Sequence, residues 1–296
     1  MQVSTRLFYD RSATAMATLT GRADALQTQI ATGKRLAAPS DDSVAYTRLS
    51  GLARAEADAE VSMKNLDVAA GVLAQADSTL SAITAQLTRA NELAISARSG
   101  TGDATARQAI ADELDQIVAQ LVSLGNTTDT RGQPLFGGAD GAAALTVGPD
   151  GYVFASTLPS AIPTGDGQAI QPGDTAARIF AQAGGNTLAT LADLSAALRS
   201  NTAVDATAAA TVDKLGLAAT QVVGVQASLG ARAARVELEQ AQLRQTGIDR
   251  EALRSGLEDT DITVAITELQ KTMTILSATQ ASFSKLQALS LFDYLR

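Results

Sequence analysis

Apolar residues recur every seven positions over two long stretches of the chain. The first stretch carries the repeat at Leu52, Ala59, Leu66, Leu73, Leu80, Leu87 and Ala94. The second carries it at Leu215, Val222, Leu229, Val236 and Leu243. A seven-residue repeat places its members on one face of an α-helix and is typical of coiled-coil packing. We therefore expect two long helices that pack antiparallel.

A companion position lies between successive members of each repeat. We assign the companions to Leu49, Glu56, Met63, Ala70, Asp77, Thr84 and Asn91 in the first stretch, and to Val212 and Ala219 in the second. Polar residues in a coiled-coil seam lower its stability but restrict its partner and alignment. The sequence thus predicts a seam that is partly polar.

Both ends of the chain show the same period. Met16, Ala23 and Ile30 repeat near the N-terminus, with Leu19 and Leu26 between them. Near the C-terminus the repeat comprises Ile262, Leu269, Leu276 and Phe283, interleaved with Ile266 and Met273. We expect two amphipathic terminal helices that pair with each other.

The middle of the chain differs from its flanks. Twelve of the 23 glycines lie between Gly125 and Gly185, and five of the six prolines lie between Pro134 and Pro172. Residues 144–147 and 152–155 are short apolar runs separated by Gly-Pro-Asp-Gly, a sequence that favours a turn between two strands. This segment is predicted to be a small β-containing insert.

Together these patterns predict a mainly α fold. It would be an elongated antiparallel helical bundle or coiled-coil rod, with a small β-containing insert at the end distal from the termini. The predicted parts are terminal axial helices at 1–38 and 262–296, a central helical rod at 39–130 and 205–261, and an insert at 131–204 that contains β-structure to about residue 185 and returns through a short helix. We expect the terminal helices to be disordered in the free subunit, because a two-helix pair leaves much of its apolar face wet.

Composition narrows the possible chemistry. The chain has 296 residues, a formal net charge of -8 and no His, Cys or Trp. It therefore lacks an imidazole base, a thiolate nucleophile and a Cys/His metal cage. The acidic balance argues against broad binding to nucleic acid or anionic lipid, and no apolar run approaches the roughly 20 residues of a membrane span. We expect no enzyme activity, no cofactor or metal, and no nucleic-acid or membrane partner.

Asp41 and Asp42 form the carboxylate pair that comes nearest to an acid-base or metal site. They follow Pro39 and Ser40, a sequence that is typical of a helix start. We expect Ser40 to be the N-cap and both carboxylates to lie in the first turn, where the helix dipole favours negative charge.

The extreme ends of the chain are unusually apolar, although termini are normally polar and frayed. One interpretation is that these side chains dock within the chain's own core. We favour the other, in which neighbouring subunits bury them. The candidate interface residues are Leu7, Phe8, Met16, Leu19, Leu26, Ile30, Leu269, Leu276, Phe283, Leu291, Phe292, Tyr294 and Leu295.

Three segments resemble the flagellin superfamily. Residues 29–36, QIATGKRL, followed by APSDD at 38–42, are similar to its N-terminal signature. Residues 265–295 are similar to the C-terminus of the hook-filament junction proteins within it. RGQPLFGG at 131–138 is similar to the Phe-Gly-Gly of that junction branch, although Pro134 departs from the usual aromatic or aliphatic residue.

The resemblance implies a structural component of the bacterial flagellum that joins hook to filament through axial helix packing. It also implies partners, namely flagellin, another hook-associated protein on the hook side, further copies of the chain in a ring, and a flagellar export chaperone. The protein would be extracellular, exported by the flagellar secretion apparatus without a cleaved signal peptide, since MQVSTRLFYD has no basic segment followed by an apolar core. Two alternatives stay open: a short filament flagellin, and an unrelated enzyme or ligand-binding module.

Overall fold

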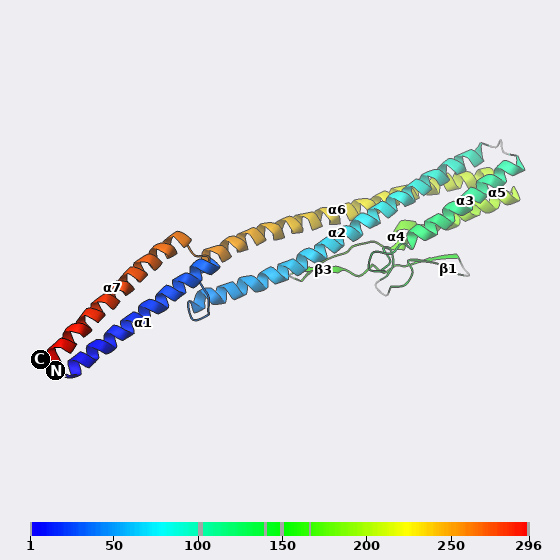
Figure 1. Cartoon of the computed structure of the whole chain (residues 1–296). Coiled ribbons are helices and arrows are strands. Elements are labelled where there is room, and N and C mark those ends of the chain that lie inside the picture. The colour runs from blue at the N-terminus through cyan, green and yellow to red at the C-terminus, as the bar shows by residue number, and fades with distance from the viewer. Residues whose placement is uncertain (1, 100–102, 139–140, 149–150, 166, 295–296) are drawn as a thin grey trace. The chain divides into compact units, whose positions relative to one another are not determined.

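A computed structural model describes residues 2–99, 103–138, 141–148, 151–165 and 167–294, with side chains for residue 7 and for residues 9 to 285 within these ranges. Its helices are α1 (Gln2–Thr32), α2 (Ser43–Arg98), α3 (Ala104–Gly125), α4 (Ala176–Phe180), α5 (Thr187–Ser200), α6 (Val204–Glu258) and α7 (Ile262–Tyr294) (Figure 1). The chain forms two compact units. Unit 1 comprises Met1–Ala57 and Thr246–Arg296, and unit 2 comprises Asp58–Gln245.

Unit 2 is built on the antiparallel pairing of α2 and α6. Gln226 donates a hydrogen bond to the Ser81 hydroxyl at 3.2 Å, and Gln240 donates one to Asp67 Oδ1 at 2.8 Å. The higher-numbered of the two α6 residues therefore bonds the lower-numbered α2 residue, as expected for antiparallel helices. Leu66, Leu73, Leu80, Leu87 and Ala94 are buried in this unit, as are Leu215, Val222, Leu229 and Val236. The predicted long antiparallel helices are confirmed.

The companion positions of both helices differ from the prediction. The buried companions lie three residues after each repeat member: Ala69, Ala76, Ile83 and Ala90 on α2, and Ala218 and Val225 on α6. Asp77 is exposed instead. Positions three and four residues ahead flank a seam residue at similar angles, about 60° on one side and 40° on the other, so periodicity alone could not choose between them. Small alanines at most of these positions let the helices approach closely. The seam is mainly apolar, but Thr211 is a buried polar member of the same register on α6, and Thr84 and Asn91 are half-buried on α2.

Helices α3 and α5 extend this core. They run antiparallel, and Ser195 on α5 donates hydrogen bonds to the Ala111 carbonyl at 3.2 Å and to Asp115 Oδ1 at 2.7 Å. Arg199 is paired with Asp112 at 2.9 Å, one turn further along α5. Buried leucines line both helices at helical spacing, among them Leu114, Leu121, Leu188, Leu191 and Leu198.

The described part of the insert contains three antiparallel hairpins, of which the sequence predicted only the first. Their strands are β1 (Leu145–Gly148) with β2 (Gly151–Phe154), β3 (Ile162–Gly165) with β4 (Gln168–Ile170), and β5 (Ala181–Gln182) with β6 (Gly185–Asn186). The expected pairing of the first two runs is confirmed by the register Leu145 with Phe154. The centre of their turn, residues 149–150, lies outside the described part of the chain.

Within unit 2 the hairpins lie along the sides of the long helices (Figure 1). Asn65 on α2 donates to the Pro163 carbonyl at 2.9 Å, and Arg235 on α6 donates to Gln168 at 2.6 Å. The aromatic core of the insert is a stack of Phe154 on Phe180, with ring centroids 5.9 Å apart. The fold is therefore mainly α and antiparallel with a small β-containing insert, as expected.

Unit 1 contains the paired helices α1 and α7 with the first turns of α2 and the last turns of α6. Near the start of α2, Asp42 accepts hydrogen bonds from the backbone N–H groups of Val44 and Ala45 at 3.1 and 2.9 Å. Asp42 is thus the N-cap, and the prediction of Ser40 in that role is wrong. Asp41 instead accepts from Ala38 and Ala37, and these bonds hold the pKa of its carboxyl below the ordinary value.

Candidate subunit interface

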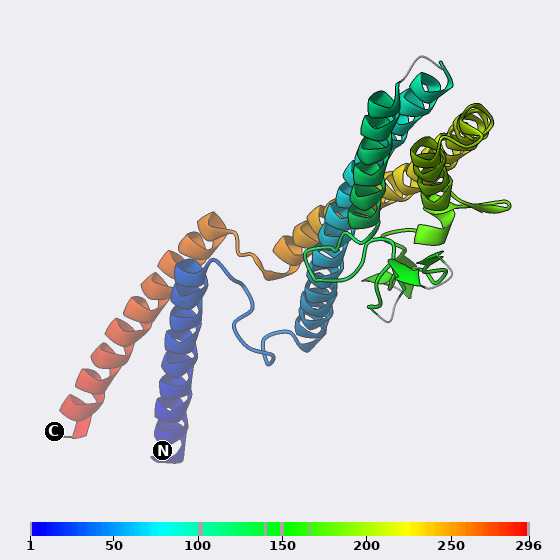
Figure 2. The same ribbon diagram turned by 90° about the vertical axis from the view of Figure 1, so that its right-hand side faces the viewer.

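The candidate interface is built on the α1–α7 pair of unit 1. The two helices run antiparallel, so α1 ends where α7 begins (Figure 2). Arg22 on α1 is paired with Glu268 on α7 at 2.5 Å, and the rings of Tyr9 and Phe283 meet edge to face with centroids 5.4 Å apart. The expected pairing of the terminal helices is confirmed by these contacts.

Most of the candidate interface residues lie in the seam between these two helices. Half-buried positions there are Met16, Leu19, Leu26 and Ile30 on α1, and Leu269, Leu276 and Phe283 on α7. The fully buried positions of the seam are small or polar, namely Ala23, Ala265 and Thr272. Because the larger side chains keep part of their surface in water, the pair alone recovers only part of the hydrophobic free energy that it could gain. Burial by another chain would recover more.

The remaining candidates lie outside this seam. Leu7 is on α1 with its side chain 51% exposed. The side chains of Phe8, Leu291, Phe292 and Tyr294, and all of Leu295, lie outside the described residues. Assignment of all these residues to contacts with another subunit stays a prediction.

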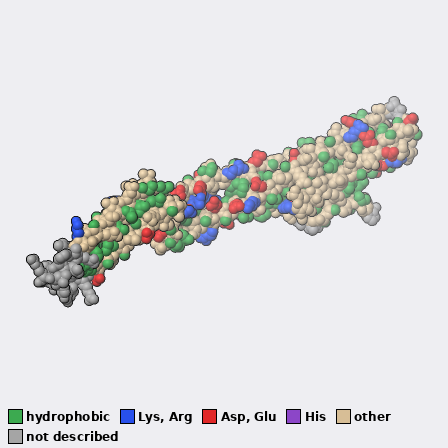
Figure 3. Space-filling model, in the orientation of Figure 1, with side chains coloured by type: hydrophobic (Ala, Val, Ile, Leu, Met, Phe, Trp, Pro, Cys, Tyr) green, Lys and Arg blue, Asp and Glu red, His purple; other side chains and the backbone are tan. Residues whose placement is uncertain are grey.

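A second set of apolar side chains lies exposed on α7. Its members are each between 41 and 57% exposed: Ile262, Val264, Ile266, Met273 and Ile275. Ile262, Ile266 and Met273 form one row beside the seam, because each lies within about 40° of the others around the helix. Figure 3 shows hydrophobic side chains gathered over the first turns of α7. The sequence pattern placed Ile262, Ile266 and Met273 in the seam, whereas the structure leaves them exposed beside it.

The surface of unit 1 carries ion pairs without a concentration of one charge. Arg254 is paired with Glu251 at 2.7 Å, and this contact raises the pKa of the guanidinium and lowers that of the carboxyl. Such exposed pairs contribute little to stability. No group of three acidic or metal-ligating side chains that could hold a metal ion occurs among the described residues. The helices described in the structure also lack the length and apolar character that a membrane span needs.

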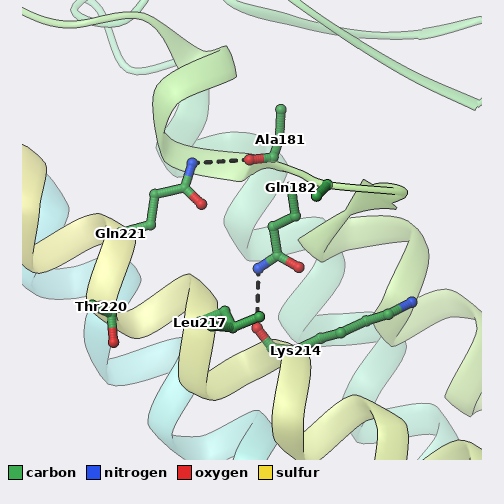
Figure 4. A pocket seen from close by; sticks show the side chains of 7 residues that line it. Ala181, Gln182, Lys214, Leu217, Thr220 and Gln221 are labelled. Carbon is green, nitrogen blue, oxygen red and sulfur yellow. Dashed lines mark hydrogen bonds between the residues drawn. The ribbon is translucent and has the colours of Figure 1, made fainter.

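A depression in unit 2 lies between the β5–β6 hairpin and α6, with a volume of about 500 Å³ (Figure 4). Two glutamine side chains that line it are engaged within the fold. Gln221 donates to the Ala181 carbonyl at 2.9 Å, and Gln182 donates to the Lys214 carbonyl at 3.0 Å. Leu217 is two-thirds exposed beside them. These side chains attach the hairpin to α6 and do not converge as acid, base and nucleophile would.

The RGQPLFGG segment forms a tight loop in unit 2. Asp129 is buried and accepts hydrogen bonds from the backbone N–H groups of Arg131 and Gln133 and from the Arg131 guanidinium. Phe136 is fully buried. A Cβ atom at Gly137 would lie 2.5 Å from Pro134 Cβ and 2.8 Å from the Ala142 carbonyl, so this position requires glycine. The loop is a packing element of the core.

The chain matches two regions of a known family. Residues 3–140 match the N-terminal helical region of bacterial flagellin, and residues 212–295 match its C-terminal helical region. The first match includes nearly all of α1 and the whole of α2 and α3, and the second includes most of α6 and the whole of α7. The matched regions therefore contain the helices that form both the α1–α7 pair and the α2–α6 pair.

Individual relatives differ in how much of the chain they cover. Flagellar hook-associated protein 3 of Salmonella typhimurium is 24% identical over 323 aligned residues, which cover 99% of both chains. Flagellin A of Vibrio cholerae is 25% identical over 129 residues, which cover 44% of this chain and 34% of that protein. The likeness to hook-associated protein 3 thus includes the insert, whereas the likeness to flagellin A leaves out more than half of the chain.

Solved structures share the fold. A flagellar hook-associated protein from Vibrio parahaemolyticus superposes with a TM-score of 0.70 at 20% identity and covers 74% of this chain and 100% of its own. Hook-associated protein 3 from Legionella pneumophila has a TM-score of 0.61 at 15% identity, with 70% and 98% covered. These structures show the shared fold. The two matched regions, which together span more than half of the residues, show that the chain belongs to the bacterial flagellin family.

Proposed function

We propose that this protein is a structural component of the bacterial flagellum that joins the hook to the filament. One observation carries the proposal: the chain aligns with hook-associated protein 3 over 99% of both sequences, but with flagellin A over 44% of itself. A filament flagellin is the alternative, and the shorter alignment with flagellin A argues against it.

The mechanism is mechanical and needs no catalysis. Helices α1 and α7 offer a half-buried seam and a further exposed row of apolar residues. In a ring of subunits, neighbouring chains would cover these surfaces and the packed axial helices would transmit torque. Aromatic and aliphatic side chains serve well as such interface anchors, because each buries a large apolar area.

The proposed partners follow from a position between two structures. Flagellin would pack on the filament side, another hook-associated protein on the hook side, and further copies of this chain around the ring. An export chaperone would cover the apolar terminal helices before secretion. Export would pass through the flagellar secretion apparatus, and the protein would act outside the cell.

Antibody labelling of isolated flagella tests the proposal. A label confined to one band between hook and filament is the expected result, and a label along the whole filament would instead identify a flagellin. Deletion of the gene in the source bacterium supplies a second measurement. We expect hooks without filaments and flagellin released into the medium, and retention of attached filaments would contradict the joining function.

A further inference from the structure

Two connecting segments of unit 1, far apart in the sequence, are bonded to each other. The first follows α1 and begins at Gly33, and the second contains the last residues of α6 and the link to α7. We call residues 33–36 and 257–260 the terminal clamp. Its two segments lie at the end of the pair where α1 finishes and α7 starts (Figure 2).

The backbone bonds of the clamp are those of a short antiparallel bridge. Lys34 is bridged with Asp259. The Arg35 N–H donates to the Glu258 carbonyl at 2.6 Å, and the Thr260 N–H donates to the Gly33 carbonyl at 2.9 Å. Each segment therefore satisfies a backbone carbonyl group of the other.

Side chains reinforce the bridge from both segments. The Arg35 guanidinium donates to the Leu257 carbonyl at 3.0 Å, although 222 residues separate them in the chain. This carbonyl belongs to the last turn of α6, which lacks partners within its own helix. The Lys34 ammonium contacts the Glu258 carboxylate. Leu36 is buried at the edge of the clamp.

The clamp also sets where the terminal helices end and begin. Gly33 has a φ of +72°, a left-handed conformation that stops α1 and that residues with a Cβ rarely adopt. Immediately after the clamp, Asp261 accepts hydrogen bonds from the N–H groups of Thr263 and Val264 at 2.9 and 3.1 Å, and so caps α7. One bonded element thus fixes the adjoining ends of both helices.

We propose that the terminal clamp couples α1 to α7, so that the two helices order and separate as one unit. The seam between the two helices buries only part of its apolar surface. A closed clamp holds the adjoining ends of the helices together before the seam forms. Closing a loop carries most of its entropic cost at the first contact, so each further contact along the seam then forms more easily. This inference goes beyond the joining function and does not depend on it, because it concerns the free chain.

Closing the clamp covalently gives the sharper test. The chain has no native cysteine, so Lys34→Cys with Asp259→Cys offers a single pair. Bridged residues of antiparallel segments lie at a Cα separation that a disulfide can span. Hydrogen exchange of the full-length double variant is compared in its oxidised and reduced states. We expect oxidation to slow exchange about tenfold in residues 9–32 and equally in residues 262–285.

A variant that weakens the clamp tests the opposite change. Arg35→Ala removes the bond to the Leu257 carbonyl, and Arg48→Ala on α2 is the matched control because Arg48 is an exposed arginine of the same unit. Arg35→Ala should raise exchange about fivefold in both terminal helices, while Arg48→Ala leaves it unchanged. The proposal would be overturned by a response confined to one helix. It would also be overturned if the disulfide protected neither helix or failed to form.

Discussion

Arg232 on α6 donates a hydrogen bond of 2.5 Å to the carbonyl oxygen of Gly173 in the insert. Its guanidinium also lies 3.7 Å from the carboxylate of Asp174, whose side chain is fully buried. The same carboxylate is 2.6 Å from the Arg178 guanidinium. A buried carboxylate requires such partners, because desolvation penalises its charged form. Arg232 therefore attaches the insert to the long helix.

Replacement of Arg232 should loosen the insert first. For Arg232→Met we expect a loss of about 1–3 kcal/mol in the free energy of unfolding, because the buried Gly173 carbonyl loses its charged donor and the buried Asp174 carboxylate loses a nearby positive charge. Hydrogen exchange should rise in residues 168–175 more than in α2. The exposed Arg244 on the same helix supplies the control Arg244→Met. Equal effects of the two replacements would show that Arg232 does not attach the insert.

The seam of unit 2 gives a stability prediction. Leu73→Ala should cost about 2–5 kcal/mol, since Leu73 is 2% exposed and the replacement leaves a cavity. Leu217→Ala on α6 should change stability by less than about 0.5 kcal/mol, because that side chain is 66% exposed. Denaturant unfolding followed by circular dichroism measures both. Similar midpoints for the two variants would be inconsistent with the packing of α2 against α6.

Asp129 gives a pH prediction. Burial alone would raise the pKa of its carboxyl, but hydrogen bonds from the Gln133 N–H and from Arg131 lower the pKa on balance. A lowered native pKa contributes stability that is present above the unfolded value of about 3.9 and is lost as pH falls through the native pKa. Acid should therefore open the loop at residues 129–136.

Asp129→Asn tests this pH dependence. The variant should be less stable at neutral pH by about 1–2 kcal/mol, and its stability should fall less than that of the native chain below about pH 4. The measurement is the unfolding midpoint at pH 6 and pH 3, with the exposed Asp77→Asn as control. An unchanged acid response in Asp129→Asn would contradict the assignment.

The exposed row on α7 gives a prediction about assembly. Ile266→Asp should leave the helical content of the free chain unchanged, because the side chain is 41% exposed. It should reduce the joining of hook to filament, since a neighbouring chain would have to bury the new carboxylate. The adjacent exposed Thr267 supplies the control Thr267→Asp. Flagellin released into the medium measures the defect, and equal release from both variants would exclude this row from the interface.

The C-terminal tail gives a further prediction, based on the sequence alone. Residues 290–296, SLFDYLR, carry apolar side chains at consecutive positions, which cannot all face one partner helix. Deletion of these residues should leave a folded unit 2 but impair joining, so that cells keep hooks and shed flagellin. Circular dichroism establishes that the shortened chain folds. Intact motile filaments on cells that express only this chain would contradict an interface role for the tail.

Local patterns in the amino-acid sequence were enough to predict the helical repeats, the place of the insert along the chain and the family. Leu66, Leu73 and Leu80 belong to the core because a seven-residue repeat can bury only one face of a helix. Residues 144–155 pair as strands because the Gly-Pro-Asp-Gly sequence between them favours a turn. These are local properties, which depend on neighbours within a few residues.

The burial of particular companion positions and the long-range arginine contacts depend on packing in the folded chain and could not be predicted from local patterns. Ala69 and Ala70 are nearly equivalent in a periodic pattern, and the neighbouring helices select the first. The Arg35 bond to the Leu257 carbonyl and the Arg232 bond to the Gly173 carbonyl join segments that are 222 and 59 residues apart. Backbone carbonyls are present at every residue, so their sequence carries no signal of which one a distant arginine will reach.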